Sequence, residues 1–554
     1  MTLTGADILA LELKNHSVEF VSTLCGNGLD PFYVACRKSG IRLIDMHNEQ
    51  AAAYLADAYG KLTGKVGVCA VSSGVAHSNA LTGVANAYFD GSPMLLITGA
   101  SSGYGANRGV FQEYDQVGLA APICKLSKCV YRVEDLGFMV EEAFRTSLSG
   151  RPGPVHLTVP LDIMEAEAEE AALETSRISS DVRSIQNSQS GRLDPNLVRE
   201  AVRMIRDSKR PILIAGSGVF YSGGQKSLTR LSEAGDIPIV TPIWDRGSVE
   251  KPHHNFLGVI GAATGEPRLL EDADLIIMAG ARVDYRVGFL EPPKISPEAS
   301  ILRIDTDPSE LTQGKTPDLA ILASPKLAFN KLAEKLKNRK NPERKEWLKE
   351  ARERWRKFRA RWIERPPPAD KPLSGWHIVN ALRPLLTDEV VFLIDGGNIG
   401  QWAHMVLADR YPSSWLTCGA SAVVGWGLPG AMAAKIAYPD RPILLLSGDG
   451  AFSFTLAEIE SAVRHHLPFV AVVANDTAWG IVVSGQRAMY GDQNVIASRF
   501  RDIRFDKVAE ALGAKGFRIN DSEELRRAVE DGFSSKVPTI IDVPVSVLGP
   551  ADVI

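Results

Sequence analysis

Cysteine is scarce in this chain, with six residues in 554, and no two of them form a CxxC pair or a metal-ligand spacing. We therefore expect reduced thiols. The chain also lacks an apolar stretch long enough to span a membrane, and its first residues lack the basic start and apolar core of a signal peptide. A formal net charge of only −4 does not favour nucleic acid or an anionic membrane as a partner. With these absences, a cytoplasmic enzyme is the default expectation.

The composition that is present, 45% hydrophobic and 23% charged, is typical of a soluble globular protein. The length is sufficient for three domains of ordinary size. Short apolar runs alternate with helical patterns in three segments, residues 1–170, 190–335 and 373–554. This alternation predicts an α/β fold with three doubly wound parallel-sheet domains. A polar stretch rich in Ser and Asn lies between the first two segments and is typical of a linker.

Residues 335–365 are dense in Lys, Arg and Glu, and they include Trp347, Trp355 and Trp362. Basic charge with interleaved aromatic residues is one feature of RNA-binding segments. The pattern favours instead a charged connecting helix whose aromatic side chains pack on a domain while its charged side chains are solvated. We expect Pro366–Pro368 to end this helix.

A Gly-Asp-Gly turn, Gly448 to Gly450, follows a predicted buried strand, and Asn475 ends the next predicted strand. Asp449 and Asn475 are therefore expected at the carboxyl ends of two parallel strands, where open α/β sheets bind ligands. Carboxylate and amide oxygens suit Mg²⁺ or Ca²⁺. The two glycines allow the backbone to approach a phosphate at the start of the following helix. The alternative is an ordinary glycine turn between a strand and a helix.

The turn and its distant Asn resemble the binding motif of thiamine-diphosphate (ThDP) enzymes, and further matches follow in order along nearly the whole chain. They point to the acetolactate synthase-like (large subunit) family, a branch that also contains 2-hydroxyacyl-CoA lyases, oxalyl-CoA decarboxylases and benzaldehyde lyase-type carboligases. The segments that carry these matches are 72–79, 110–113, 122–125, 280–288, 304–310, 395–399 and 419–429.

The resemblance implies a pyrimidine-binding domain at 1–170, a central domain at 190–335 and a diphosphate-binding domain at 373–554. It also implies that ThDP and Mg²⁺ lie between the pyrimidine domain of one subunit and the diphosphate domain of another, in a homodimer or homotetramer. ThDP enzymes need a carboxylic acid beside N1′ of the aminopyrimidine, and the match places it at Glu49. The alternative is that Glu49 is an exposed acid in the first turn of a helix, where the helix dipole favours it.

The resemblance also assigns roles position by position. It implies a metal site made by the side chains of Asp449 and Asn475 and the backbone oxygen of Thr477. It places Ala422 at the 4′-amino group and Val424 where a bulky residue holds the cofactor bent. The other expected cofactor contacts are Asn398, Ile399, Gly448, Gly450, Ala451, Gly74 and Asn79. The expected substrate contacts are Cys25, Asn27, Phe111, Trp479, Ile481 and Val482, and the expected catalytic residues are Glu49, Gln112 and His77.

Several positions depart from the family pattern. Cys25 lies in a Cys-Gly-Asn turn that replaces Pro-Gly-Gly, and it either faces the substrate or is structural. His77 replaces a small residue in a loop that borders the cofactor, so it either transfers protons or is a structural histidine. Gly485 stands where acetolactate synthases carry a Trp that selects the second 2-keto acid. Together with the bulky Trp479, it predicts an altered acceptor pocket.

The sequence thus predicts a ThDP- and Mg²⁺-dependent enzyme that makes or cleaves carbon–carbon bonds by 2-keto acid decarboxylation and carboligation. A lyase acting on 2-hydroxyacyl-CoA, or one like oxalyl-CoA decarboxylase, is the alternative, because Asn48-Glu49-Gln50 is closer to the lyase pattern. A non-catalytic regulatory paralogue is the alternative from another class. The central domain can hold FAD or an ADP moiety in this branch, although residues 259–265 replace the usual MxGxHG. The substrate, the acceptor and the reaction direction stay open.

Overall fold

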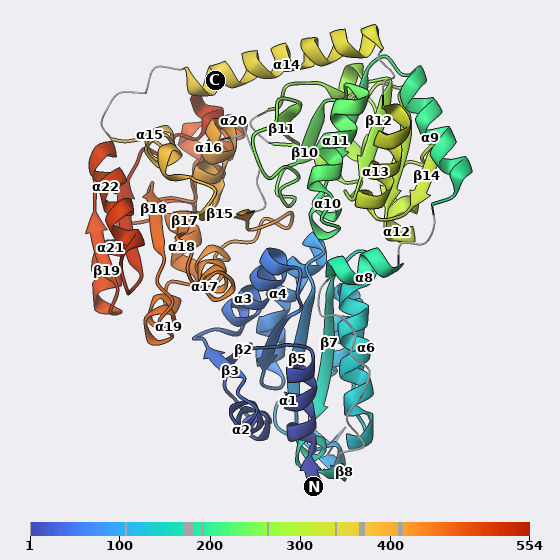
Figure 1. The fold of residues 1–554 in the computed structure, drawn as a ribbon. Coiled ribbons are helices and arrows are strands. Elements are labelled where there is room, and N and C mark those ends of the chain that lie inside the picture. The colour runs from blue at the N-terminus through green and yellow to red at the C-terminus, as the bar shows by residue number, and fades with distance from the viewer. Residues whose placement is uncertain are drawn as a thin grey trace.

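Three six-stranded parallel sheets follow one another along the chain, each covered by helices (Figure 1). The computed structural model describes residues 2–105, 108–169, 182–189, 193–262, 265–337, 341–364, 372–407 and 414–553. The predicted α/β fold class, with three doubly wound parallel sheets, is confirmed. Most of the predicted linker between the first two segments, and Pro366–Pro368, lie outside the described residues.

The N-terminal sheet has the strand order β3-β2-β4-β5-β7-β6. Its order reverses between β2 and β4, which places a ligand-binding crevice at the carboxyl ends of these two strands. The strands are β2 (Phe20–Leu24), β3 (Arg42–Asp45), β4 (Gly67–Val71), β5 (Met94–Ala100), β6 (Leu126–Cys129) and β7 (Pro154–Pro160). The helices are α1 (Gly5–Asn15), α2 (Asp30–Lys38), α3 (Glu49–Thr63), α4 (Val75–Asp90), α5 (Gln116–Ala120), α6 (Leu136–Leu148) and α7 (Leu161–Glu165). A short antiparallel pair, β1 (Thr2–Thr4) and β8 (Glu167–Glu169), and helix α8 (Val182–Gln189) complete this part.

The central sheet has the order β11-β10-β9-β12-β13-β14, with its reversal between β9 and β12. Its strands are β9 (Pro211–Ala215), β10 (Ile239–Pro242), β11 (Phe256–Ile260), β12 (Leu275–Ala279), β13 (Ser300–Asp305) and β14 (Leu319–Leu322). Its helices are α9 (Pro195–Asp207), α10 (Ser217–Tyr221), α11 (Gln225–Gly235), α12 (Pro308–Thr312) and α13 (Pro325–Leu336).

The C-terminal sheet has the order β16-β15-β17-β18-β20-β19 and reverses between β15 and β17. Its strands are β15 (Val391–Asp395), β16 (Trp415–Thr417), β17 (Ile443–Gly448), β18 (Val470–Asn475), β19 (Lys515–Arg518) and β20 (Thr539–Pro544). Its helices are α15 (Gly375–Leu382), α16 (Gly397–Leu407), α17 (Gly427–Ala437), α18 (Asp449–Phe454), α19 (Glu458–Arg464), α20 (Gly480–Tyr490), α21 (Phe505–Ala511) and α22 (Ser522–Phe533).

The predicted charged helix is α14 (Pro342–Ile363), which runs from the central domain to the C-terminal domain (Figure 1). Trp347 is buried and donates from Nε1 to the carbonyl of Pro211 at 3.0 Å. Trp362 is also buried, whereas the side chains of Lys349 and Arg356 are largely exposed. The helix therefore packs by these two Trp residues and exposes these two charges, as the sequence predicts, whereas Arg344 and Arg359 on the same helix are buried.

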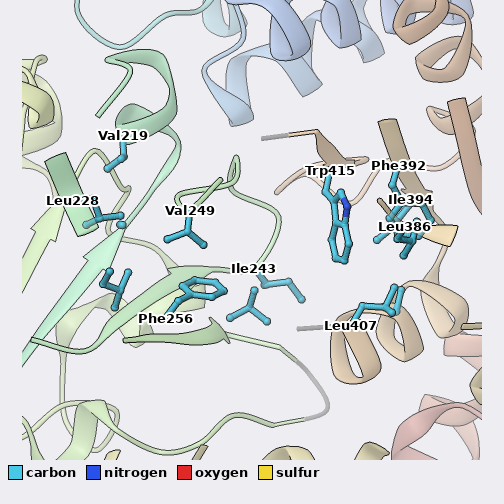
Figure 2. Close-up of a cluster of buried hydrophobic side chains, with 14 of the residues drawn as sticks. Val219, Leu228, Ile243, Val249, Phe256, Leu386, Phe392, Ile394, Leu407 and Trp415 are labelled. Carbon is cyan, nitrogen blue, oxygen red and sulfur yellow. The ribbon is translucent and has the colours of Figure 1, made fainter. Parts of the chain in front are cut away.

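Shared hydrophobic clusters join the C-terminal domain to both of the others. Val219, Ile243 and Phe256 of the central domain belong to one cluster with residues of the C-terminal domain that include Leu407 and Trp415 (Figure 2). A second cluster joins α3 of the N-terminal domain to α17. These clusters fix the carboxyl edge of the C-terminal sheet against its neighbours. None of the helices in the described ranges is both long and apolar enough to cross a bilayer.

Candidate active site

The carboxyl edge of the C-terminal sheet brings Asp449 and Asn475 to neighbouring positions. β17 and β18 run parallel, and Gly448 pairs with Ala474 in their register. The next residues are Asp449, which begins α18, and Asn475, which ends β18. Both side chains are buried, with only 3% and 2% of their surface exposed. A carboxylate and an amide thus meet at one edge of the sheet, away from water.

The amide of Asn475 is held in one orientation by its nitrogen. Nδ2 donates to Oδ1 of Asp542 and to the carbonyl of Ile503, both at 3.0 Å, and to Oδ1 of Asp502 at 3.3 Å. The oxygen Oδ1 is buried and has no hydrogen-bond partner among the described residues. A buried acceptor without a partner is uncommon, and a bound cation would satisfy this oxygen.

The carboxyl group of Asp449 lies beside a second acid, Asp476. Burial, together with the nearby charge of Asp476, raises the pKa of Asp449 to about 8. Burial also raises the pKa of Asp476, to about 6. The backbone amide of Ala478 donates to both residues, at 3.3 Å to Asp449 and at 3.1 Å to Asp476. Two acids crowded into a poorly solvated place form a site that a divalent cation would neutralise.

The third expected metal contact, the backbone oxygen of Thr477, lies in a strained turn. Thr477 has a φ of 54°, in the left-handed region. Its carbonyl accepts a hydrogen bond from the amide of Phe500 at 2.7 Å, which leaves one lone pair. Within the described ranges, no group of three or more His, Cys, Asp and Glu residues is placed to hold a metal. A metal here would rest on one carboxylate with amide and backbone oxygens, a set that suits a hard cation.

A cavity of about 440 Å³ opens next to this edge, within the range of small-molecule sites. The expected cofactor and substrate residues that line it are Asn398, Ile399, Ala422, Val424, Gly448, Asp449, Gly450, Ala451, Trp479 and Ile481. A side chain at Gly450 would come within 2.6 Å of the ring of Trp479, and one at Gly396 within 2.8 Å of the amide of Gly448. Glycine at these positions lets the backbone line the cavity directly. Asn475, Thr477 and Val482 flank the cavity without lining it.

The loop 418–426, which carries Ala422 and Val424, is held by the N-terminal domain of the same chain. The carboxylate of Asp90 accepts from the amide of Ala420 at 2.8 Å, and that of Asp57 accepts from Nε1 of Trp426 at 2.9 Å. Ala422 has a φ of 55°, and its amide donates to the carbonyl of Gly419 at 3.0 Å. The loop thus forms a tight turn whose ends are tied to α3 and α4.

The N-terminal domain places Glu49 at the first turn of α3, directly after the capping residue Asn48. The Glu49 side chain is half-buried, and Oε2 accepts a hydrogen bond from Nδ2 of Asn79 at 3.1 Å. Gly74, whose φ is 64°, precedes α4, and its amide donates to Gln116 at 2.8 Å. Glu49, Asn79 and Gly74 therefore lie around the amino-terminal ends of α3 and α4.

Gln112 and Phe111 lie on a loop next to this group. Oε1 of Gln112 accepts from the hydroxyl of Ser73 at 3.1 Å. A side chain at Gly74 would come within 2.5 Å of Cβ of Gln112, so the two loops touch. Phe111 is an apolar side chain with 67% of its surface exposed.

His77, by contrast, is fully buried beneath this surface. Its ring packs edge-on against His156 at 4.7 Å, and neither ring nitrogen has a partner within the described part of the chain. Burial lowers the pKa of His77 to about 4, so the ring is neutral at pH 7. Cys25 and Asn27 are exposed in the turn after β2, where the carbonyl of Asn27 accepts from Ser72 at 2.8 Å.

Within one chain the two groups of predicted residues do not meet. None of Glu49, Gln112 and His77 lines the 440 Å³ cavity, whose walls come from the C-terminal and central domains. Sequence reasoning misses Asp476, Trp244 and Tyr285, which also line it. Asp476 could have been found as a second acid next to Asn475. Tyr285 lies in the matched segment 280–288, but neither it nor Trp244 carried a signal for a place beside the C-terminal sheet.

Three family models match the chain in order. The "thiamine pyrophosphate enzyme, N-terminal TPP binding domain" matches residues 3–119, and the central domain of the same enzymes matches 198–332. The C-terminal TPP binding domain matches 395–543, which contains the edge with Asp449 and Asn475.

Similar proteins of known name cover almost the full chain. The acetolactate synthase large subunit of Parasynechococcus marenigrum is 30% identical, over 98% of this chain and 88% of its own length. The 2-hydroxyacyl-CoA lyase 2 of Caenorhabditis elegans is also 30% identical, over 96% of this chain and 87% of its own length. The probable acetolactate synthase large subunit of Methanococcus aeolicus is 29% identical, over 98% and 92%.

Proposed function

Because this chain belongs to the thiamine pyrophosphate enzymes, we propose that it makes or cleaves carbon–carbon bonds at a site built from two copies of itself. The predicted dependence on ThDP agrees with the three matched domains, and the predicted acetolactate synthase-like family agrees with the relatives of that name. Because these relatives are enzymes, an enzyme is favoured over the regulatory alternative. We propose below which residues bind ThDP and Mg²⁺, which reaction the enzyme catalyses and how many copies of the chain form one active site.

The observation that carries the proposal is the unpaired oxygen of Asn475 beside the buried acid Asp449. We propose that these two side chains and the carbonyl of Thr477 hold Mg²⁺, which would neutralise Asp449 and Asp476. Gly448, Gly450, Ala451, Asn398 and Ile399 would contact the diphosphate. Here the amides at the start of α18 and the glycine backbone favour an anion.

ThDP, when bound, supplies the electron sink that stabilises a carbanion next to a carbonyl. The chain's own residues would then position it. Ala422 would accept from the aminopyrimidine through its carbonyl, and Val424 would fill the space under the bend. Glu49 would hold a proton at the aminopyrimidine nitrogen, with Asn79 orienting its carboxylate.

A second copy of the chain is required because Glu49 does not reach the cavity of its own chain. The surface around Glu49, with the exposed Phe111, would cover the cavity of the partner. We propose that Gln112 and Phe111 approach the substrate from there, with Gly74, Cys25 and Asn27 nearby. Trp479, Ile481 and Val482 would face it from the other side. A homodimer is then the smallest active unit, and a homotetramer would contain it twice.

His77 is buried, so its ring is not placed to exchange a proton with a bound substrate, as its predicted role requires. In the present packing its side chain is fully buried, so unlike Glu49 and Phe111 it is not presented to a partner's cavity. A structural role is the better proposal for this residue.

The reaction proposed is decarboxylation of a 2-keto acid followed by carboligation. The alternative, cleavage of a 2-hydroxyacyl-CoA, is supported by the 30% identity to a lyase and by the lyase-like residues Asn48, Glu49 and Gln50. The test is to reconstitute the protein with ThDP and Mg²⁺ and to supply pyruvate, benzoin-type ketols and 2-hydroxyacyl-CoA esters in turn. Product from keto acids or ketols supports the proposal. Product from the CoA ester alone would reject it in favour of the lyase.

A further inference from the structure

The crevice at the reversal point of the central sheet is almost filled by the protein itself. It lies at the carboxyl ends of β9 and β12, where open α/β sheets of this kind bind nucleotides. The sequence left FAD or an ADP moiety as an expectation for this domain. The space that remains is about 30 Å³, far below the roughly 300–1,000 Å³ of small-molecule sites.

The turn after β9, which a phosphate would approach, is already bound by an acid. Oδ2 of Asp245 accepts a hydrogen bond from the amide of Ser217 at 2.9 Å. The hydroxyl oxygen of Ser217 accepts from the amide of Arg246 at 2.9 Å. The segment that carries Asp245 therefore closes over the first turn of α10. Figure 1 shows this helix at the end of the central domain that faces the N-terminal domain.

Arg286, one of the cations that line this crevice, is also fully engaged. Arg286 is 2% exposed, and its Nη1 donates to Oδ1 of Asp245 at 2.5 Å and to the carbonyl of Ile243 at 2.8 Å. Its Nη2 donates to Asp284 at 2.8 Å, and its Nε donates to the same carboxylate at 3.1 Å. The two acids raise the pKa of Arg286, so the guanidinium stays charged. A diphosphate would have to displace both carboxylates from this arginine.

The backbone and the opposite wall leave no room either. A side chain at Gly218 would come within 2.6 Å of Cα of Gly280, so the turns after β9 and β12 touch. The crevice is also lined by the acids Asp305 and Glu310, and its further cation Arg282 is paired with Glu310, with Nε 3.6 Å from Oε1. The N-terminal domain closes the crevice: the amide of Arg151 donates to Asp307 at 3.0 Å, and its guanidinium lies 3.5 Å from Glu310.

From this packing we infer that the central domain binds no nucleotide, because Asp245 occupies the place of a phosphate and Arg286 is neutralised by the protein's own acids. The domain then serves to join the other two rather than to hold FAD or ADP. The residues do not fit FAD, and no step of the proposed reaction involves it. This inference does not depend on the substrate, since ThDP-dependent turnover and flavin content are measured separately.

The main test uses the wild-type protein reconstituted with ThDP and Mg²⁺. After denaturation, the supernatant is assayed for flavin fluorescence and for adenine nucleotides. The folded protein is also titrated with FAD and with ADP by calorimetry. We expect neither compound to be released and no saturable heat of binding. Release of either in a stoichiometric amount, or saturable binding of FAD or ADP at micromolar concentration, would overturn the inference.

A pair of variants tests whether Asp245 stands in for an anion. Asp245→Gly empties its position, whereas Glu250→Gly removes an equal charge from an exposed position on the same loop. Inorganic phosphate should raise the Tm of Asp245→Gly more than that of the wild type or of Glu250→Gly. An equal response in all three would overturn the role given to Asp245. If Asp245→Gly does not fold, the wild-type titration still decides the inference.

Discussion

At the scale of single residues, the carboxylate of Glu49 accepts a hydrogen bond from the side-chain amide of Asn79. We expect Glu49→Gln to lower kcat by about 10²-fold or more, since a positioned proton-transfer group contributes at least that much. The metal site lies elsewhere, so the affinity for ThDP should change far less than kcat. Steady-state kinetics and a ThDP titration measure the two quantities.

The matched control is Glu134→Gln, which removes a similar charge from an exposed place in the same domain. Its kcat should equal that of the wild type. A Glu49→Gln variant with unchanged turnover would contradict the role proposed for Glu49.

Asn475 is the second residue whose contacts make a sharp prediction. Asn475→Ala should raise the Mg²⁺ concentration needed for half-maximal activity, because it removes the unpaired oxygen. It also removes the donor to Asp542 and Ile503, so stability should fall by about 1–3 kcal/mol. Asp502→Asn is the comparison for the Mg²⁺ dependence, because it leaves the oxygen of Asn475 in place while it alters the 3.3 Å contact and the 2.7 Å ion pair of Asp502 with Arg518. If both variants keep the wild-type dependence on Mg²⁺, the metal is held elsewhere.

At the scale of elements, helix α3 carries a buried charged group that supports the loop 418–426. Lys61 lies 3.0 Å from Asp57, forms a second ion pair with Asp90, and stands over the ring of Trp426 at 5.0 Å. Both acids hold the loop through Trp426 and Ala420. The helix thus positions part of the cavity wall without touching the cavity.

We expect Lys61→Met to lower the stability by roughly 3–5 kcal/mol, because it leaves two buried acids without their cation. The ThDP concentration for half-saturation should rise as the loop loosens. Urea unfolding and a ThDP titration measure these effects, and Lys65→Met, an exposed lysine just after α3, is the control. A loss of stability with unchanged ThDP affinity would show that the loop does not depend on this group.

The sequence is a good guide to elements and a poor one to contacts between domains. The apolar runs 211–215 and 275–279 form strands β9 and β12, because strands buried on both faces need continuous apolar residues. The turn at Asp449 is also predictable from the sequence, because its glycines are required by the local backbone geometry. Asp245 belongs to no periodic pattern. Its hydrogen bonds with Ser217 and Arg286 depend on how three loops pack together, and a local sequence pattern does not predict that packing.

At the scale of the whole molecule, the separation of Glu49 from the cavity predicts complementation between subunits. Glu49→Gln and Asp449→Asn should each be nearly inactive alone. After the two are mixed and allowed to exchange subunits, half of the dimers are mixed. Each mixed dimer has one site with both changes and one with neither. We expect about a quarter of the wild-type activity to return, as two-fold symmetry requires.

The control for this experiment mixes Glu49→Gln with wild-type protein, which should give an intermediate activity that changes little on exchange. Activity measured before and after exchange, with native mass spectrometry to confirm the mixed dimers, decides the outcome. A mixture of the two variants that stays inactive once mixed dimers have formed would mean that each chain builds its site alone.

Helix α3 is under selection from two directions. Its first residue, Glu49, faces the surface proposed to meet a partner, while Asp57 and Lys61 support the cavity of its own chain, and eleven of its fifteen residues are buried. A substitution in α3 must preserve both the surface proposed to meet the partner and the support of the cavity in its own chain. In a library of neutral variants we therefore expect α3 to accumulate substitutions more slowly than the exposed positions of α14, such as Lys349 and Arg356.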